Sequence, residues 1–276
     1  MLTIRRWMEA ITSDIADIAL SRACVACDAI GSVLCSTCRA SLTTVRRHEV
    51  RRWDRDAFGG AGGAGGAGGA GGAGGTGVAG GTGASGYAEA MPPVIVASAY
   101  EGAAKRVIIA HKEHGVLGLT PVLGSMLAMS IAVLGEGPFA IVAIPPHRDS
   151  MKRRGVDTLG AIAERAASEL RAAGWRAQTL PLLRRRSDGG RHVGRSAHER
   201  RAAVSGTMVV DDRISRRGVI GSAQGPRLVV VDDVVTTGAT VQEAVRTLRA
   251  TGLAVEGIAA VAGTQRPGVG SVSGFR

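Results

Sequence analysis

The chain has 276 residues, 45% hydrophobic but only 3% aromatic, so one to three domains with largely aliphatic cores are expected. The 34 Lys and Arg residues outnumber the 23 Asp and Glu residues, and the formal net charge of +11 favours anionic partners. Nucleic acid and phosphorylated small molecules both fit that charge. No run of 18 apolar residues occurs, so no membrane span is expected.

The first twenty residues superficially suggest a signal peptide. Glu9, Asp14 and Asp17 interrupt any apolar core of such a peptide, so this interpretation fails. Apolar residues at helical spacing instead predict an amphipathic helix. The expected location is the cytoplasm.

All four cysteines lie within the stretch CVACDAIGSVLCSTC, as Cys24, Cys27, Cys35 and Cys38. Two C-x₂-C pairs separated by seven residues are typical of a four-cysteine zinc site, in which four thiolates leave no open coordination position. A structural Zn²⁺ is therefore expected. Such modules often contact DNA, but stabilising a segment too small for its own core explains zinc equally well.

A Gly-rich segment spans residues 59–86 and contains no proline, which excludes a collagen-like repeat. Gly-Gly repeats bury too little apolar surface to offset backbone entropy, so a flexible linker is expected. It separates an N-terminal helix and zinc module (1–58) from a larger domain (87–267), which a short tail (268–276) follows.

Strand-like and helix-like runs alternate along the larger domain. Strands are predicted at 94–100, 139–144, 177–183, 227–233 and 254–263, and helices at 101–113, 119–134, 157–173 and 239–251. This alternation predicts an α/β fold with a parallel sheet flanked by helices.

The stretch LVVVDDVVTTGAT (228–240) carries the chemistry. Asp232 and Asp233 come at the carboxyl end of a strand, where open parallel sheets bind ligands. The loop Thr236, Thr237, Gly238, Ala239 and Thr240 then opens a helix, whose N-terminal amides suit a phosphate. Carboxylates can accept from sugar hydroxyls or lie near Mg²⁺. The pattern predicts a ribose 5-phosphate site, although turn and N-cap roles would also use these residues.

This stretch resembles the phosphoribosyl pyrophosphate (PRPP) motif of type I phosphoribosyltransferases. Three further segments resemble the ComF family of competence-associated proteins within that superfamily: YEGAAKRVIIAHKEHG (100–115), AIPPHRDSMKRRGVDTL (143–159) and GRSAHERR (194–201). The resemblance covers residues 18–58 and 94–263. It implies a type I phosphoribosyltransferase-like fold that transfers ribose 5-phosphate with release of pyrophosphate.

The resemblance also implies roles for individual residues. Asp232 and Asp233 would be the catalytic pair and bind the ribose hydroxyls, and residues 236–240 would hold the 5-phosphate. The turn Pro145, Pro146, His147 and Arg148 would face pyrophosphate, with Mg²⁺ bridging pyrophosphate and sugar. The family's usual Arg-Gly-Phe-Asn-Gln is replaced here by residues 154–158, and His192, Ala203 and Met208 stand where Gln, Asn and Phe are usual.

Residues 184–204 include seven arginines and two acids. They fit a flap that closes over pyrophosphate, a solvated loop, or contact with nucleic acid. Three functions therefore remain open: a phosphoribosyltransferase with an unknown acceptor, an accessory protein of competence and DNA uptake that binds single-stranded DNA or the uptake machinery, and a PRPP sensor without turnover.

Overall fold

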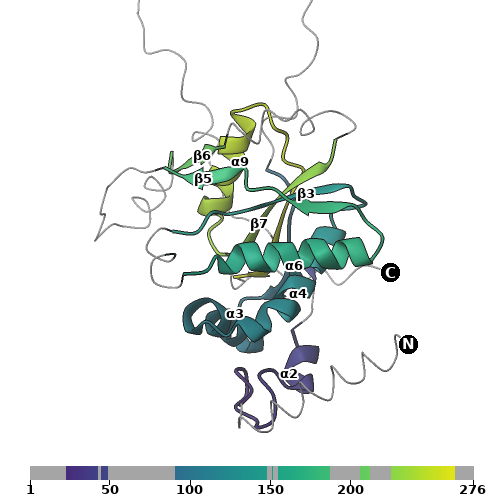
Figure 1. The fold of residues 1–276 in the computed structure, drawn as a ribbon, viewed down its shortest axis with the longest axis vertical. Helices are drawn as coiled ribbons and strands as arrows, with labels where there is room; N and C mark the ends of the chain where they lie inside the picture. Colours follow the sequence, from purple (N-terminus) through teal and green to yellow (C-terminus); the bar gives the residue numbers. More distant parts are fainter. Residues whose placement is uncertain are drawn as a thin grey trace, which may run out of the picture. The chain divides into compact units, whose positions relative to one another are not determined.

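The computed structural model describes residues 23–42, 45–48, 91–147, 151, 155–186, 206–211 and 225–264. These residues form a six-stranded sheet, a two-stranded ribbon and the helices that cover them (Figure 1). The expected N-terminal helix, the Gly-rich segment 59–86 and the tail 268–276 lie outside the described residues.

The main sheet contains five parallel strands and one short antiparallel edge strand. In spatial order the strands are β1 (Arg46–Arg47), β2 (Val94–Ala99), β8 (Gly257–Gly263), β7 (Arg227–Val235), β3 (Phe139–Ala143) and β4 (Ala177–Thr179). In this sheet β1 runs antiparallel, along β2, and the other pairings are parallel. Every residue of β2 and β8 is buried, because both faces of the sheet are covered.

Helices pack on both faces of this sheet. The described helices are α2 (Ser36–Ala40), α3 (Gly102–His114), the 3₁₀ turn η2 (Leu117–Leu119), α4 (Thr120–Ala132), α6 (Thr158–Ala172) and α9 (Ala239–Arg249). Val229 and Val231 of β7 join a core cluster with α4 and α6. Leu228 and Val230 point to the opposite face, because side chains alternate along a strand. Helix α9 packs against β7, and its buried residues lie outside that cluster.

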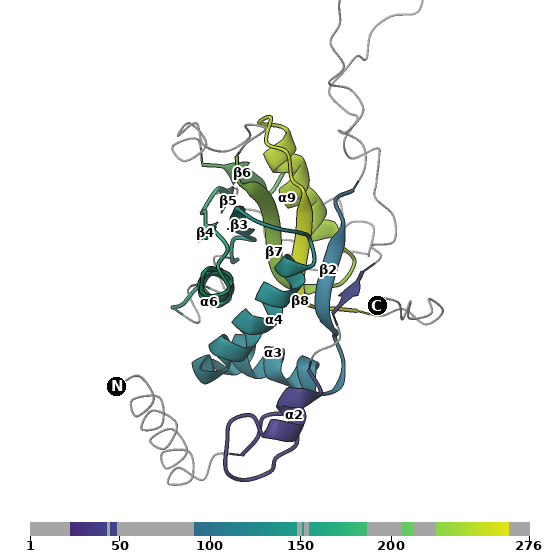
Figure 2. The ribbon, with the colours of Figure 1, turned by 90° about the vertical axis from the view of Figure 1, so that its right-hand side faces the viewer.

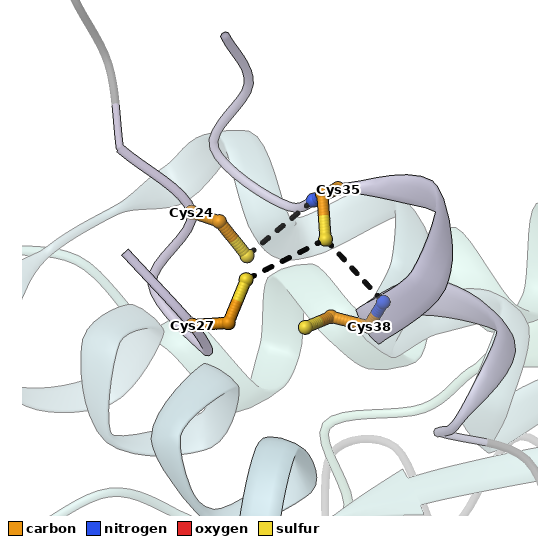
Figure 3. Close-up of side chains that lie close together, drawn as sticks. All are labelled: Cys24, Cys27, Cys35 and Cys38. Carbon is orange, nitrogen blue, oxygen red and sulfur yellow. Dashed lines mark hydrogen bonds between the residues drawn. The ribbon is translucent and has the colours of Figure 1, made fainter. Parts of the chain in front are cut away.

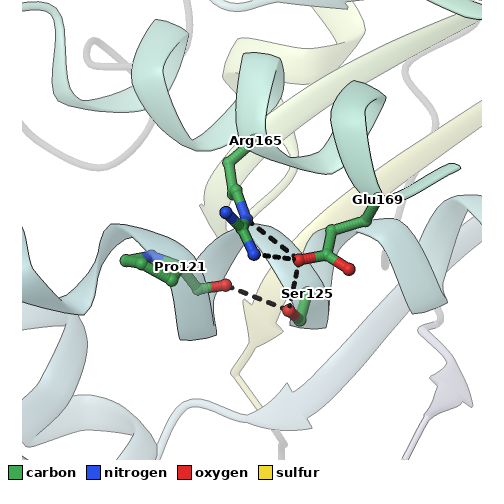
Figure 4. Close-up of polar contacts among 4 residues, drawn as sticks. All are labelled: Pro121, Ser125, Arg165 and Glu169. Carbon is green, nitrogen blue, oxygen red and sulfur yellow. Dashed lines mark hydrogen bonds and ion pairs between the residues drawn. The ribbon is translucent and has the colours of Figure 1, made fainter. Parts of the chain in front are cut away.

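Helices α4 and α6 approach closely at Gly124. A Cβ atom there would lie 2.3 Å from Cγ of Arg165, so only glycine fits at this crossing. Beside it, Arg165 Nε donates to Glu169 Oε1 at 2.9 Å, and Ser125 Oγ donates to the same oxygen at 3.3 Å (Figure 4). The contact therefore combines close backbone packing with a polar rim, and it holds α6 beside α4 on one face of the sheet.

The cysteine-rich segment shares this core. Cys24, Ala26, Leu34 and Leu42 are buried and belong to the same cluster as residues of α3 and α4. Described residues before and after the Gly-rich segment also fall into one compact unit. The segment therefore buries its few apolar side chains against the α/β core instead of forming a core of its own.

The predicted alternation of strands and helices is confirmed, with one exception. The run expected as a single strand at 177–183 is divided: β4 ends at Thr179, and β5 (Leu183–Arg185) pairs antiparallel with β6 (Met208–Val210). Pro181 lies in the break, and proline cannot donate to a strand ladder. The β5–β6 ribbon lies beside α9, as Figures 1 and 2 both show.

Candidate active site

The chain reverses its direction across the sheet between β3 and β7. From β3 it passes through α6 to β4, away from β7, whereas from β7 it passes through α9 to β8, away from β3. Right-handed crossovers in opposite directions require helices on opposite faces, as is observed. In open parallel sheets, ligands bind beyond the carboxyl ends of the strands at such a switch point.

Asp232 and Asp233 lie at this switch point but point to opposite faces of the sheet, because side chains alternate along β7. Asp233 is on the face of α3 and α4, where its Oδ2 lies 2.5 Å from Nζ of Lys112. Oδ1 of Asp232 accepts a hydrogen bond of 2.8 Å from the backbone N–H of Asp233. The two carboxylates therefore have different surroundings, which adjacency in the sequence does not reveal.

The surroundings of Asp232 also change its pKa. Burial, and then the negative charge of Asp233, raise the pKa of Asp232 to about 8, while Lys112 opposes the shift. The buried His111 lies beside Lys112 on α3, and its Nε2 is 2.9 Å from Oγ1 of Thr120. Burial lowers the pKa of His111, and the negative charge of Asp233 offsets this shift only in part. Carboxyl groups with pKa values displaced in this way cluster at functional sites.

The loop after β7 presents backbone amides at the same edge. Thr236 and Thr237 are exposed, and Gly238 is the N-cap of α9 with φ of +82°, a left-handed conformation that favours glycine. The N-cap Gly238 has no side chain to cap α9, Oγ1 of Thr237 accepts a 3.4 Å hydrogen bond from the N–H of Ala239, and the first turn, which includes Ala239 and Thr240, contains no acidic residue. These amides and the positive end of the helix dipole can hold an anion.

The turn after β3 lies next to Asp232. Ala143 pairs with Val231, and the N–H of Ile144 donates to the carbonyl of Val231 at 3.0 Å, so Pro145 follows at the level of the aspartates. Pro145 and Pro146 are partly buried, and His147 is exposed. Arg148 lies outside the described residues.

Arg185 was not singled out by sequence reasoning, although it belongs to the arginine-rich segment 184–204. It extends from β5, and its Nε donates to the carbonyl oxygen of Pro145 at 3.0 Å. Burial lowers the pKa of this guanidinium, and the charge of Asp232 offsets this shift only in part. The β5–β6 ribbon thus adds a cation between the ends of β3 and β7, a placement that only the antiparallel pairing creates.

The four cysteines form a compact cluster at the other candidate site (Figure 3). Their Sγ atoms all lie within 4.8 Å of one another, and those of Cys27 and Cys35 are 3.7 Å apart. Tetrahedral zinc with Zn–S bonds of about 2.3 Å requires sulfur atoms about 3.8 Å apart, so the cluster matches this geometry. The cysteines can hold a metal such as zinc.

Local backbone structure builds this cluster. Asp28 has φ of +62°, and the turn from Cys24 closes through a 2.8 Å hydrogen bond from the N–H of Asp28 to the carbonyl of Cys24. Cys35 caps α2, with its Sγ accepting from the N–H of Cys38. Each C-x₂-C pair therefore lies on a tight turn that brings its two sulfurs together.

The cluster also favours a bound cation. Burial raises the pKa of Cys24, but backbone N–H groups, chiefly that of Cys35, outweigh it and lower the pKa to about 6. Neighbouring thiols, with Cys27 first, raise the pKa of Cys38 to about 12. Four sulfurs this close cannot all ionise unless a positive charge lies among them, which is the role of a metal ion.

One departure from the family pattern has a structural explanation. Asp157 stands where the resemblance would place Asn, and its Oδ1 accepts from the N–H of Gly160 at 2.9 Å as the N-cap of α6. Asp and Asn cap helices equally well, so this exchange keeps the local structure. Val156 is exposed, Thr158 begins α6, and Met208 is buried in β6. His192 and Ala203 lie outside the described residues.

No protein-family model matches the chain, and no curated protein matches it. Among the described helices, none has the length and apolar character needed to cross a bilayer.

Proposed function

We propose that this chain is a PRPP-binding, phosphoribosyltransferase-like protein of the ComF family that transfers ribose 5-phosphate to an acceptor with release of pyrophosphate. One observation carries the proposal. The paired acids of β7, the Gly238 turn at the start of α9 and the end of β3 meet at the point where the strand order reverses. In this proposal the paired acids bind the sugar, the Gly238 turn and the start of α9 bind the 5-phosphate, and the end of β3 faces the pyrophosphate.

In this proposal Asp232 accepts hydrogen bonds from the ribose hydroxyls. Asp233, neutralised by Lys112, supports the position of Asp232 and can share the diol if Lys112 moves. The amides of residues 238–240 hold the 5-phosphate. Displacement of pyrophosphate from C1 passes through an oxocarbenium-like state, to which the protein contributes positioning and charge stabilisation.

The proposal assigns the two metals different places. Zn²⁺ at Cys24, Cys27, Cys35 and Cys38 is structural, since four thiolates complete its coordination. Among the described residues, these cysteines form the one group of three or more potential metal ligands. Mg²⁺ would therefore enter with PRPP, bound mainly by pyrophosphate and sugar oxygens.

Calorimetric titration of the full chain with PRPP in the presence of Mg²⁺ tests binding. A screen of nucleobases and amines for pyrophosphate release then tests transfer. Saturable binding with release for some acceptor supports the enzyme, and binding without release for any acceptor supports the PRPP sensor. Absence of PRPP binding would refute both.

A second candidate is an accessory role in competence and DNA uptake. The observation in its favour is the net charge of +11, which attracts nucleic acid irrespective of sequence. This function needs no turnover and is compatible with PRPP binding. Direct binding of single-stranded DNA distinguishes it from a purely metabolic enzyme.

A further inference from the structure

A pocket lies at the amino edge of the main sheet, opposite the edge that carries the paired acids. The parallel strands β2, β7 and β8 begin there, and Pro93 and Glu256 come directly before β2 and β8. Arg227 is the first residue of β7, and Asp232 is five positions later, about 17 Å away at 3.3 Å per residue. This amino-edge pocket is therefore separate from the switch point.

The amino-edge pocket encloses about 360 Å³, a volume typical of small-molecule sites. Its lining residues are the apolar Pro93, Ile95, Val133 and Leu134 and the charged Arg47, Arg227 and Glu256. Helix α4 packs across β2 and β8 (Figure 2) and ends at Ala132, so the two residues after it reach the strand starts. A Cβ atom at Gly257 would lie 2.5 Å from Cδ1 of Leu134, so this leucine lies against the bare backbone of β8.

The charged lining residues carry an excess of positive charge. Nε of Arg227 donates to Oε2 of Glu256 at 2.7 Å, and its Nη1 donates to the carbonyl of Glu136 at 3.3 Å, so this guanidinium is anchored. Within the described residues its Nη2 has no acceptor, and the exposed side chain of Arg47 makes no hydrogen bond or ion pair. Guanidinium N–H groups match the two oxygens of a carboxylate. Two cations beside one paired acid therefore suit an anionic ligand.

We propose that the amino-edge pocket binds a small monocarboxylic acid with a hydrocarbon body. The carboxylate contacts Arg47 and Arg227, and the hydrocarbon part packs on the apolar lining residues. A neutral ligand would leave the cations without a partner. An anion without a hydrocarbon part would leave Val133, which is 49% exposed, uncovered and would gain nothing from apolar burial. The assignment does not depend on the proposed function.

The first test compares three probes by calorimetry with the full chain: octanoate, octanol and acetate. Octanoate should bind saturably at one site. Octanol and acetate should each bind at least roughly tenfold more weakly, because one lacks the charge and the other lacks the hydrocarbon body. Saturating ribose 5-phosphate should leave octanoate binding unchanged, since the two ligands occupy opposite edges of the sheet.

The second test uses substitutions in the pocket lining. Arg47→Gln should weaken octanoate binding roughly tenfold, through loss of a charged hydrogen bond. Val133→Ser should weaken it about threefold, through loss of apolar contact. The matched control Arg39→Gln removes the same charge from an exposed position on α2 and should bind octanoate like the unmodified chain. Equal thermal unfolding temperatures show that the variants are folded.

Four outcomes would overturn the assignment. They are absence of saturable octanoate binding, octanol binding as tight as that of octanoate, equal weakening by Arg47→Gln and Arg39→Gln, and competition between octanoate and ribose 5-phosphate. Equal weakening would show a general effect of net charge, and competition would place octanoate at the switch point. Failure of the chain to bind PRPP would refute the proposed function and leave this assignment unaffected.

Discussion

Removal of a metal ion bound by the four cysteines should destabilise the α/β domain as well as the cysteine-rich segment. The physical reason is the shared core, because Leu34 and Leu42 are 6% and 1% exposed and pack in the cluster that includes α3 and α4. Without a metal the two C-x₂-C turns lose the ion that joins them. Leu34, between the two pairs, and Leu42, just after the second pair, then lose their fixed place against the domain.

The size of the effect follows from the burial of the two leucines. Each fully buried leucine contributes about 1.5–3 kcal/mol, so exposing both costs the folded domain about 3–6 kcal/mol. Domains are stable by only about 5–15 kcal/mol, so this is a large fraction. At about 2–4 °C per kcal/mol for a domain of this size, the main thermal transition should fall by roughly 6–24 °C.

Scanning calorimetry of the full chain with and without a zinc-selective chelator measures this shift, and elemental analysis establishes the metal content. Cys27→Ser should reproduce the lowered transition without a chelator. Ser36→Ala, a substitution on the exposed surface of α2 between two cysteine positions, should not. A main transition that keeps its temperature after verified metal loss would refute the coupling. Absence of metal from the purified protein, with all four thiols reactive, would refute the metal site itself.

Four further outcomes are expected. Replacing Asp232 and Asp233 by Asn should weaken PRPP binding on the order of a hundredfold, with less effect on a 5-phosphate lacking both hydroxyls. Gly238→Val should abolish binding of every sugar 5-phosphate, since valine is strained at φ of +82° and blocks the amides. Calorimetry with PRPP and with the 5-phosphate lacking both hydroxyls separates the effect of the Asp changes from that of Gly238→Val. Variants that bind PRPP as tightly as the unmodified chain would refute both predictions. The pKa of Asp232, raised to about 8 by burial and Asp233, exceeds the unfolded value of about 4, so the free energy of unfolding should fall as pH rises between them. Asp232→Asn should therefore stabilise the chain more at pH above about 8 than near pH 4, and urea titrations giving equal differences would contradict this. Single-stranded DNA should bind weakly at low salt and dissociate steeply as salt rises, and an anisotropy titration without association at low salt would exclude direct DNA binding.

Much of the fold could be predicted because its signals are local. The run 228–231 is apolar and is followed by two acids, and helix 239–249 follows a Gly turn, so both elements are recognisable without neighbours. The cysteine cluster could also be predicted, since C-x₂-C spacing alone forms a tight turn with two convergent sulfurs. The β5–β6 ribbon could not, because its strands have three residues each and are joined by a long segment, so neither has a clear period.

The sequence by itself determined the candidate functional residues: four thiols at metal-binding spacing, and two carboxylates beside a Gly-containing helix start. Only the tertiary structure decided which side chains surround these residues. Strand order places the end of β3 beside β7, and alternation along β7 separates Asp232 from Asp233, which pairs with Lys112. Pairing of β5 with β6 brings Arg185 to Pro145. These contacts join residues far apart in the chain, and their partners are set by packing of the whole domain, which no local pattern encodes.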